Sequence, residues 1–282
     1  MLNALSAEAL KMRTHKATWF LVWLFPIVFT ILFIIGILIG VFGGEAPEQT
    51  PLARWISDTA VIWKVPPNSV GRYLMAAFVA VVFAGEYGWN TWKLIVPHRA
   101  RASLIAAKYA LVLLLLLASF VLTALISIAG TFAEDMLTGD TIPAGITLGG
   151  LLHAHWLGLL ASLGPILVTM AYASLAAVLT RSTIAALVIT IVFTTIEQIV
   201  FNLGPVLSIN FPAVTQFLYH VLPGYHLGNV ESWIMEGTAY RGEFPSGRVV
   251  ALPWMTSLAV VAAWVIALVT ATFAAFRRQD IN

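Results

Sequence analysis

The sequence predicts an all-α integral membrane protein, and three observations carry this prediction. Of its 282 residues, 60% are hydrophobic and 10% are charged, and the mean hydropathy is +0.91, whereas soluble proteins contain about 25% charged residues. Long windows carry no Asp, Glu, Lys or Arg, namely residues 17–44, 109–133, 141–180 and 249–276. These windows lack the alternation of apolar and polar residues found in membrane β-strands. Helices of roughly 20 residues therefore cross the bilayer.

We expect one transmembrane domain over residues 1–282 with six spans. In chain order, the spans cover about residues 17–43, 69–88, 104–132, 152–179, 183–203 and 252–275. The second span is short, because Arg72 and Glu86 lie near its ends, and we expect these two side chains to reach the two membrane interfaces.

Residues 1–16 predict an amphipathic helix that lies on the membrane surface before the first span. Apolar residues occupy one face of this helix and basic residues lie elsewhere on it. The apolar face consists of Leu2, Leu5, Ala9 and Met12. The apolar run that follows is longer than the core of a signal peptide, so we expect it to be retained as a span.

Residues 204–251 allow two interpretations. Their uncharged part, 204–230, could be a seventh span, but Pro205, Pro212 and Pro223 divide it into pieces too short to cross. We expect a re-entrant segment and loop on the outer side, packed on the ends of the helices.

The distribution of basic residues orients the chain. With a cytoplasmic N-terminus, ten of the 15 Lys and Arg residues lie on the inner side, as the positive-inside rule requires. They are Lys11, Arg13, Lys16, Lys93, Arg99, Arg101, Lys108, Arg181, Arg277 and Arg278. We therefore expect both termini in the cytoplasm. As a separate expectation, we place the protein in the inner membrane of a prokaryote.

The sequence offers no set of residues that predicts catalysis. It contains no Cys, which excludes disulfides and Cys-ligated metals, and no Gly-Lys dipeptide, which excludes a Walker A phosphate loop. His153 and His155 are two residues apart and point to different sides of a helix. The pI near 9.0 follows from the basic inner segments and requires no nucleic acid. We expect no cofactor, no metal and no enzymatic activity in this chain.

Glu197 is a charged residue deep inside a predicted span. Polar residues at four-residue spacing form a stripe beside it, because such positions share one helix face. The stripe is Thr190, Thr194, Gln198 and Asn202. An ionisable group at this depth faces protein or water, not lipid. The stripe is therefore either a wall of a translocation path or a set of helix-packing contacts.

Gly36, Gly40 and Gly44 recur every four residues along the first span. Small residues on one face let two helix backbones approach closely. The contact lies either within the chain or between two subunits.

The segment between the second and third spans is the most informative. It contains Glu86, Asn90, Thr91, Trp92, Lys93, Pro97, Arg99 and Arg101, and Lys108 follows it. Mixed aromatic and basic residues ending at a proline suit a short helix parallel to the membrane on its cytoplasmic side. The basic residues alone would also satisfy the positive-inside rule.

This segment resembles the cytoplasmic loop of the type-2 ABC exporter permeases, which are six-span subunits that pair with separate ATPases. Members commonly show a Glu ending the second span, a Gly or Asn followed by Thr, a leucine-rich turn, a Pro, one or two Arg, and a Lys opening the third span. The matching positions here are Glu86, Asn90-Thr91, Leu94-Ile95, Pro97, Arg99 and Arg101, and Lys108. Asn90 stands where Gly is commoner.

The resemblance implies a coupling helix over Glu86 to Arg101 that is seated in a groove of a cytoplasmic ATPase. The working unit would contain two permease subunits, identical or related, and two ATPases that bind ATP and Mg. An apolar path with a few polar groups suits an amphipathic or hydrophobic cargo, such as a peptide antibiotic, a lipid or a drug. The alternatives are an ion- or proton-coupled carrier that uses Glu197, and an intramembrane enzyme or assembly subunit.

Overall fold

The computed structural model describes residues 6, 8–12, 16–43, 50–88, 100–245 and 247–279. The described part of the chain is almost entirely helical. Its strands are β1 (Gly242–Glu243) and β2 (Val249–Val250), which form an antiparallel hairpin with Gly242 opposite Val250.

Six helices are long and apolar enough to cross a membrane, which confirms the all-α prediction. They are α2 (Lys16–Gly43), α4 (Ser69–Gly88), α6 (Arg101–Thr138), α7 (Leu148–Thr180), α8 (Thr183–Asn210) and α11 (Trp254–Arg278). The helices α6 and α8 run beyond the expected 104–132 and 183–203. The helix α6 continues to Thr138 and ends before Gly139, which has a positive φ, and α8 continues through Pro205 to Asn210.

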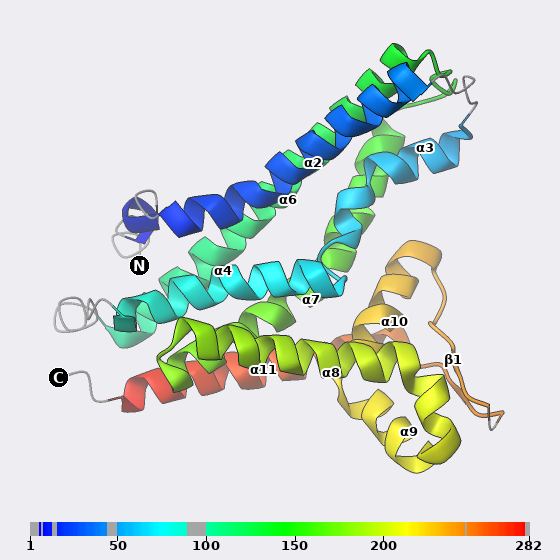
Figure 1. The fold of residues 1–282 in the computed structure, drawn as a ribbon. Coiled ribbons are helices and arrows are strands. Elements are labelled where there is room, and N and C mark those ends of the chain that lie inside the picture. The colour runs from blue at the N-terminus through cyan, green and yellow to red at the C-terminus, as the bar shows by residue number, and fades with distance from the viewer. Residues whose placement is uncertain are drawn as a thin grey trace.

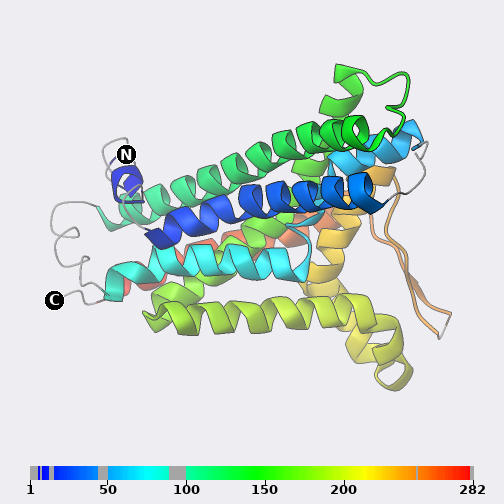
Figure 2. The same cartoon turned by 45° about the horizontal axis from the view of Figure 1, so that its top comes forward.

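The helices run side by side between two ends of a bundle (Figures 1 and 2). One end, here called the terminal end, holds residues 8–12, the end of α4, the start of α6 and the end of α11. The opposite end holds the short helices and the hairpin. The helices α4 and α7 are the most buried of the six, whereas α2 and α11 expose most of their surface. Small side chains such as Ala76 and Ala80 of α4 and Ala173 and Ala177 of α7 are fully buried, which lets these helices pack closely against their neighbours.

The glycines of the first span pack against α6 of the same chain. A Cβ atom at Gly36 would lie 2.8 Å from Oε1 of Glu134, and one at Gly40 would lie 2.3 Å from Cγ2 of Thr138. Of the two contacts left open by the sequence, the described residues therefore form the one within the subunit. Gly44 lies outside the described residues.

Short helices cover the opposite end. They are α3 (Leu52–Thr59), the 3-10 helix η1 (Val61–Lys64), α9 (Pro212–Val221) and α10 (Pro223–Glu236). A proline begins both α9 and α10, where its missing N–H is not needed. With 10 and 14 residues, these two helices are shorter than the roughly 20 residues that a span requires.

Buried polar side chains join α10 to α11. Nε2 of His226 donates to the carbonyl of His220 at 3.1 Å, so Nδ1 accepts from the hydroxyl of Ser257 at 3.0 Å. Nδ2 of Asn229 donates to the same hydroxyl and to the carbonyl of Leu252. Burial lowers the pKa of His226 below its ordinary value, because the charged ring would lose its hydration.

This burial predicts that acid weakens the junction between α10 and α11. Unfolded His226 has a pKa of about 6.5, and the folded value is lower. At pH 8 His226 is neutral in the folded and the unfolded chain, so it does not change the free energy of unfolding. This free energy decreases as the pH falls from about 6.5 toward the folded pKa, because the unfolded chain binds the proton more readily. We expect the thermal midpoint to drop between pH 8 and pH 5, and to drop less in His226→Gln. An equal drop in both proteins would contradict the prediction.

Candidate functional site

A buried charge network lies at the terminal end, where the N-terminal segment meets α4 and α6. Nζ of Lys108 donates to Glu86 at 2.9 Å, to Glu8 at 3.0 Å and to the carbonyl of Val82 at 3.2 Å. Lys11 forms a further ion pair with Glu86. The side chains of Lys108 and Glu86 are each 1% exposed. Two basic and two acidic side chains thus lock three segments together.

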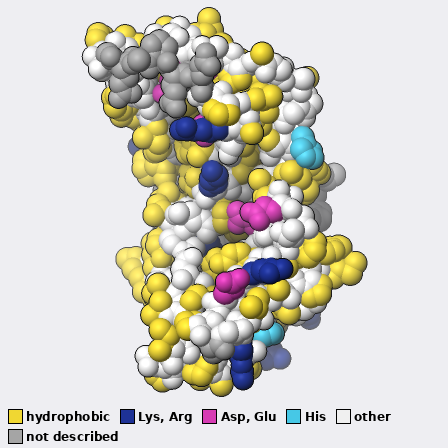
Figure 3. Space-filling view, turned by 90° about the vertical axis from the view of Figure 1, so that its right-hand side faces the viewer, with side chains coloured by type: hydrophobic (Ala, Val, Ile, Leu, Met, Phe, Trp, Pro, Cys, Tyr) yellow, Lys and Arg dark blue, Asp and Glu magenta, His cyan; other side chains and the backbone are white. Residues whose placement is uncertain are grey.

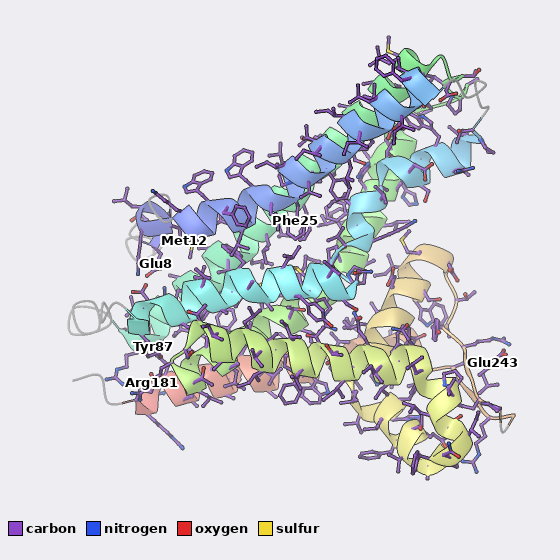
Figure 4. The ribbon with its side chains drawn as sticks, viewed as in Figure 1. Glu8, Met12, Phe25, Tyr87, Arg181 and Glu243 are labelled. Carbon is purple, nitrogen blue, oxygen red and sulfur yellow. The ribbon has the colours of Figure 1, made fainter. Side chains whose placement is uncertain are left out.

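The network corrects the expectation that Glu86 reaches the membrane interface. The carboxylate of Glu86 is turned into the bundle, because Lys108 and Lys11 supply charges that stabilise it away from water. It also explains why Glu8 is buried whereas Ala9, expected on the apolar face, is exposed. Figure 4 shows Glu8 and Met12 beside the start of α2, with Tyr87 at the same end of the bundle.

A second set of contacts ties the end of α11 to the other helices of the terminal end. Nη1 of Arg101 donates to the carbonyls of Phe276, Arg277 and Gln279 at 3.3, 2.9 and 2.7 Å. A cation at a helix C-terminus complements the unpaired carbonyls. The side chain of Gln279 accepts from Tyr87 of α4 at 2.7 Å and donates to the carbonyl of Val178 of α7 at 2.6 Å.

The predicted coupling segment is thus anchored at both of its ends. Glu86 is its first residue and Arg101 its last, and both are bonded to helices that pass through the bundle. The other predicted coupling residues lie outside the described residues. They are Asn90, Thr91, Trp92, Lys93, Pro97 and Arg99. Their role stays a prediction.

Glu197 is paired inside the bundle. Nη1 of Arg72 in α4 donates to Oε2 of Glu197 at 2.7 Å, and the hydroxyl of Tyr172 in α7 donates to Oε1. Nε of Arg72 donates to Thr169 at 2.9 Å. Arg72 and Glu197 are each 2% exposed. Arg72 therefore does not reach the interface as expected, because the carboxylate of Glu197 offers it a partner in the interior.

The polar stripe of α8 divides into two parts. Thr190 and Thr194 are buried, and Thr190 donates back to the carbonyl of Ala186, a bond internal to the helix. Gln198 and Asn202 instead line a cavity at the opposite end. The stripe therefore serves packing in its first half and borders an open space in its second half.

This space, here called the polar cavity, has a volume of about 350 Å³ and lies between α4, α7, α8 and α10. Its charged lining residues are Lys64, Arg72 and Glu231. Burial raises the pKa of Glu231, with a contribution from Glu236, while Lys64 opposes the shift. Gly224 admits α10 to this place, because a Cβ there would lie 2.8 Å from the carbonyl oxygen of Glu197.

Within the described part of the chain, no group of three His, Asp or Glu residues could hold a metal ion. Nδ1 of His155 accepts from the indole of Trp63 at 3.0 Å, which makes His155 a packing residue of η1 and α7. The presence or absence of a cofactor stays a prediction.

Comparison with known protein families identifies the chain's relatives. Residues 4–197 match the family described as ABC-2 family transporter protein. The chain belongs to the ABC-2 transporter family. No curated protein matches it. ABC-2 permeases are membrane subunits that work with ATPase subunits, and the family match covers the terminal-end network and four complete spans, from α2 to α7.

The partners of the intramembrane charges of this ABC-2 permease were not predicted from its sequence. Arg72 and Lys108 appeared only as a span boundary and as a motif position, and Glu8 and Tyr172 were not singled out. A signal was available for Arg72. The helix α4 ends, and α8 begins, at the terminal end of the bundle. Arg72 lies about 16 residues from that end along α4, and Glu197 lies about 14 residues from it along α8. Antiparallel helices bring such positions to the same depth.

Proposed function

We propose that this chain is the membrane subunit of an ATP-driven exporter for an amphipathic or hydrophobic cargo. Two copies, or this chain and a related permease, would assemble with two cytoplasmic ATPases that bind ATP and Mg. The terminal end would face the cytoplasm of a prokaryotic cell, with the protein in the inner membrane. ABC-2 family membership and the excess of basic residues at this end support the proposal.

The observation that carries the coupling part of the proposal is the anchoring of the segment between α4 and α6. Lys108 and Glu86 fix its two flanks to each other, and Arg101 fixes it to the end of α11. A push on this segment by an ATPase would therefore move α4, α6 and α11 together, as rigid helices transmit displacement.

The carrier alternative loses its main support. It depended on a lone carboxylate in a span, whereas Glu197 is bonded to Arg72 and Tyr172. A carboxylate already bonded to a guanidinium and a tyrosine hydroxyl is not the unpartnered group that this alternative requires.

Cross-linking from single cysteines tests the proposal, since the natural chain contains no Cys. Lys93→Cys, labelled with a photoactivatable benzophenone in whole cells, is expected to cross-link to a protein with ATPase activity. Glu243→Cys, in the hairpin at the opposite end, is the matched control and is expected to give no such product. Cross-linking from Glu243→Cys alone, or a transport-competent protein that purifies without an ATPase, would contradict the proposal.

A further inference from the structure

Two hollows lie next to each other in the half of the bundle toward the opposite end. One is the polar cavity. The other, here called the apolar groove, has a volume of about 620 Å³ and is lined by apolar side chains of α7, α10 and α11. Pro165 and Leu227 line both hollows, so these two residues form the boundary between them. A polar and an apolar hollow that share a boundary match the two parts of an amphiphile.

Two basic residues line the polar cavity, and one of them carries a donor that the described residues leave unused. Nη2 of Arg72 is buried and has no hydrogen-bond partner among the described residues, although Nη1 and Nε of the same guanidinium are bonded. A buried donor without a partner destabilises the protein, because it has lost its bonds to water. Arg72 and Lys64 both line the cavity. Together they present two cationic donors, and phosphate is a group that guanidinium and ammonium donors bind well.

Glu231 is the only acidic lining residue of the polar cavity in the described part of the chain, against the two basic residues Lys64 and Arg72. Burial and nearby Glu236 raise the pKa of its carboxyl, while Lys64 opposes the shift. Figure 3 looks onto this end of the molecule, where acidic and basic side chains lie near one another between hydrophobic flanks.

The apolar groove has the dimensions of a lipid chain. Its wall on α11 runs from Trp254 to Ile266, which is about 18 Å at 1.5 Å per residue. One leaflet contributes roughly 15 Å of hydrocarbon. Both α7 and α11 are among the membrane-spanning helices. The acyl chains of the surrounding bilayer are therefore the apolar molecules that lie next to the groove.

We propose that the two hollows form one site for an anionic phospholipid, with the phosphate at Lys64 and Nη2 of Arg72 and one acyl chain in the apolar groove. The phosphate accepts a hydrogen bond from the unpartnered Nη2 of Arg72, and the acyl chain fills the space between α7, α10 and α11. This site is independent of whether the chain is an exporter, because a lipid can be retained without any transport.

Lipid retention by the purified full-length protein tests the site. The protein is equilibrated in bilayer discs of equal parts phosphatidylglycerol and phosphatidylcholine, and retained lipid is counted by native mass spectrometry. We expect the wild-type chain to retain phosphatidylglycerol in preference. Lys64→Gln is expected to reduce this retention roughly threefold to tenfold, because one charge-assisted contact is lost. Ala262→Trp fills the groove and is expected to abolish it.

Two matched variants serve as controls. Arg54→Gln removes an exposed charge on α3, and Ala263→Trp adds the same bulk to the exposed side of α11. Both are expected to retain the lipid. Arg72 itself is left unchanged, because its loss would also break the pair with Glu197.

Equal retention of the two lipids by the wild-type chain would overturn the proposal. So would equal loss in Ala262→Trp and Ala263→Trp, or a loss of the preference in Arg54→Gln as large as in Lys64→Gln. A phosphatidylglycerol preference that excess inorganic phosphate removes, and that Ala262→Trp leaves intact, would show an anion site without a chain site and would also overturn it.

Discussion

Replacing Glu197 by Leu is expected to lower the free energy of unfolding by about 3–5 kcal/mol, because it leaves the guanidinium of Arg72 buried without its counter-charge. Arg72 is 2% exposed and its Nη1 bonds to Glu197 at 2.7 Å. For a chain of this size the loss corresponds to a thermal midpoint lower by roughly 6–20 °C. Circular dichroism of the purified protein during heating measures this shift.

The double variant Arg72→Met with Glu197→Leu separates the charge from the packing. It removes both ions, so we expect it to recover most of the stability that Glu197→Leu loses. Glu243→Leu, at an exposed position of the hairpin, is the control and should unfold within a few degrees of the wild type. If the double variant is no more stable than Glu197→Leu, the ion pair is not the reason for the loss.

Lys108→Met is expected to uncouple ATP hydrolysis from the membrane subunit. It removes the cation that holds Glu8 and Glu86 together, so these carboxylates repel each other and the flank of the segment after α4 is released. Changes along a coupling network alter coupling by about 0.5–2 kcal/mol, or roughly twofold to thirtyfold. The measurement is the stimulation of ATP hydrolysis by the permease in the purified complex.

Stimulation has to be compared at equal amounts of folded protein. Lys16→Met removes an exposed basic residue at the same end of the bundle and should leave stimulation intact. The triple variant with Glu8→Gln, Glu86→Gln and Lys108→Met removes the three buried charges of the network and leaves only Lys11, whose side chain is 32% exposed, so it should restore stability but not coupling. Normal stimulation in Lys108→Met would show that the network only supports the fold.

Four of the six spans were predictable because long apolar windows without charges and without strand-like alternation form helices in a bilayer. The other two, α4 and α8, were expected despite the charges of Arg72, Glu86 and Glu197. The pairing of intramembrane charges was not assembled from the sequence, because Arg72 and Glu197 are far apart in the chain and each could be explained alone. Arg72 could snorkel, and Glu197 could line a path. Only the packing of α4 against α8 decides between these explanations, and packing depends on which small residues, such as Ala76 and Ala80, face a neighbour.

The sequence indicated where along the chain the candidate coupling site lies, but not which partners its charged side chains bind. The residues flanking the segment between α4 and α6 stood out in the sequence. However, Glu86 and Arg101 were expected to act at a surface, and the structure turns both toward the bundle. The polar cavity could not be predicted, because it needs α10 to lie over α8, and this follows from the contact of Gly224 with the backbone of Glu197.

The separation of Arg72 and Glu197 along the chain also sets an order for biogenesis. They lie 125 residues apart, so at 5–20 residues per second the ribosome makes Glu197 roughly 6–25 s after Arg72. During this interval α4, the least apolar of the six spans, carries an arginine whose carboxylate partner has not been made. Stable insertion of α4 therefore waits for α8, and a chain truncated before residue 197 should leave α4 as the span most easily lost from the bilayer.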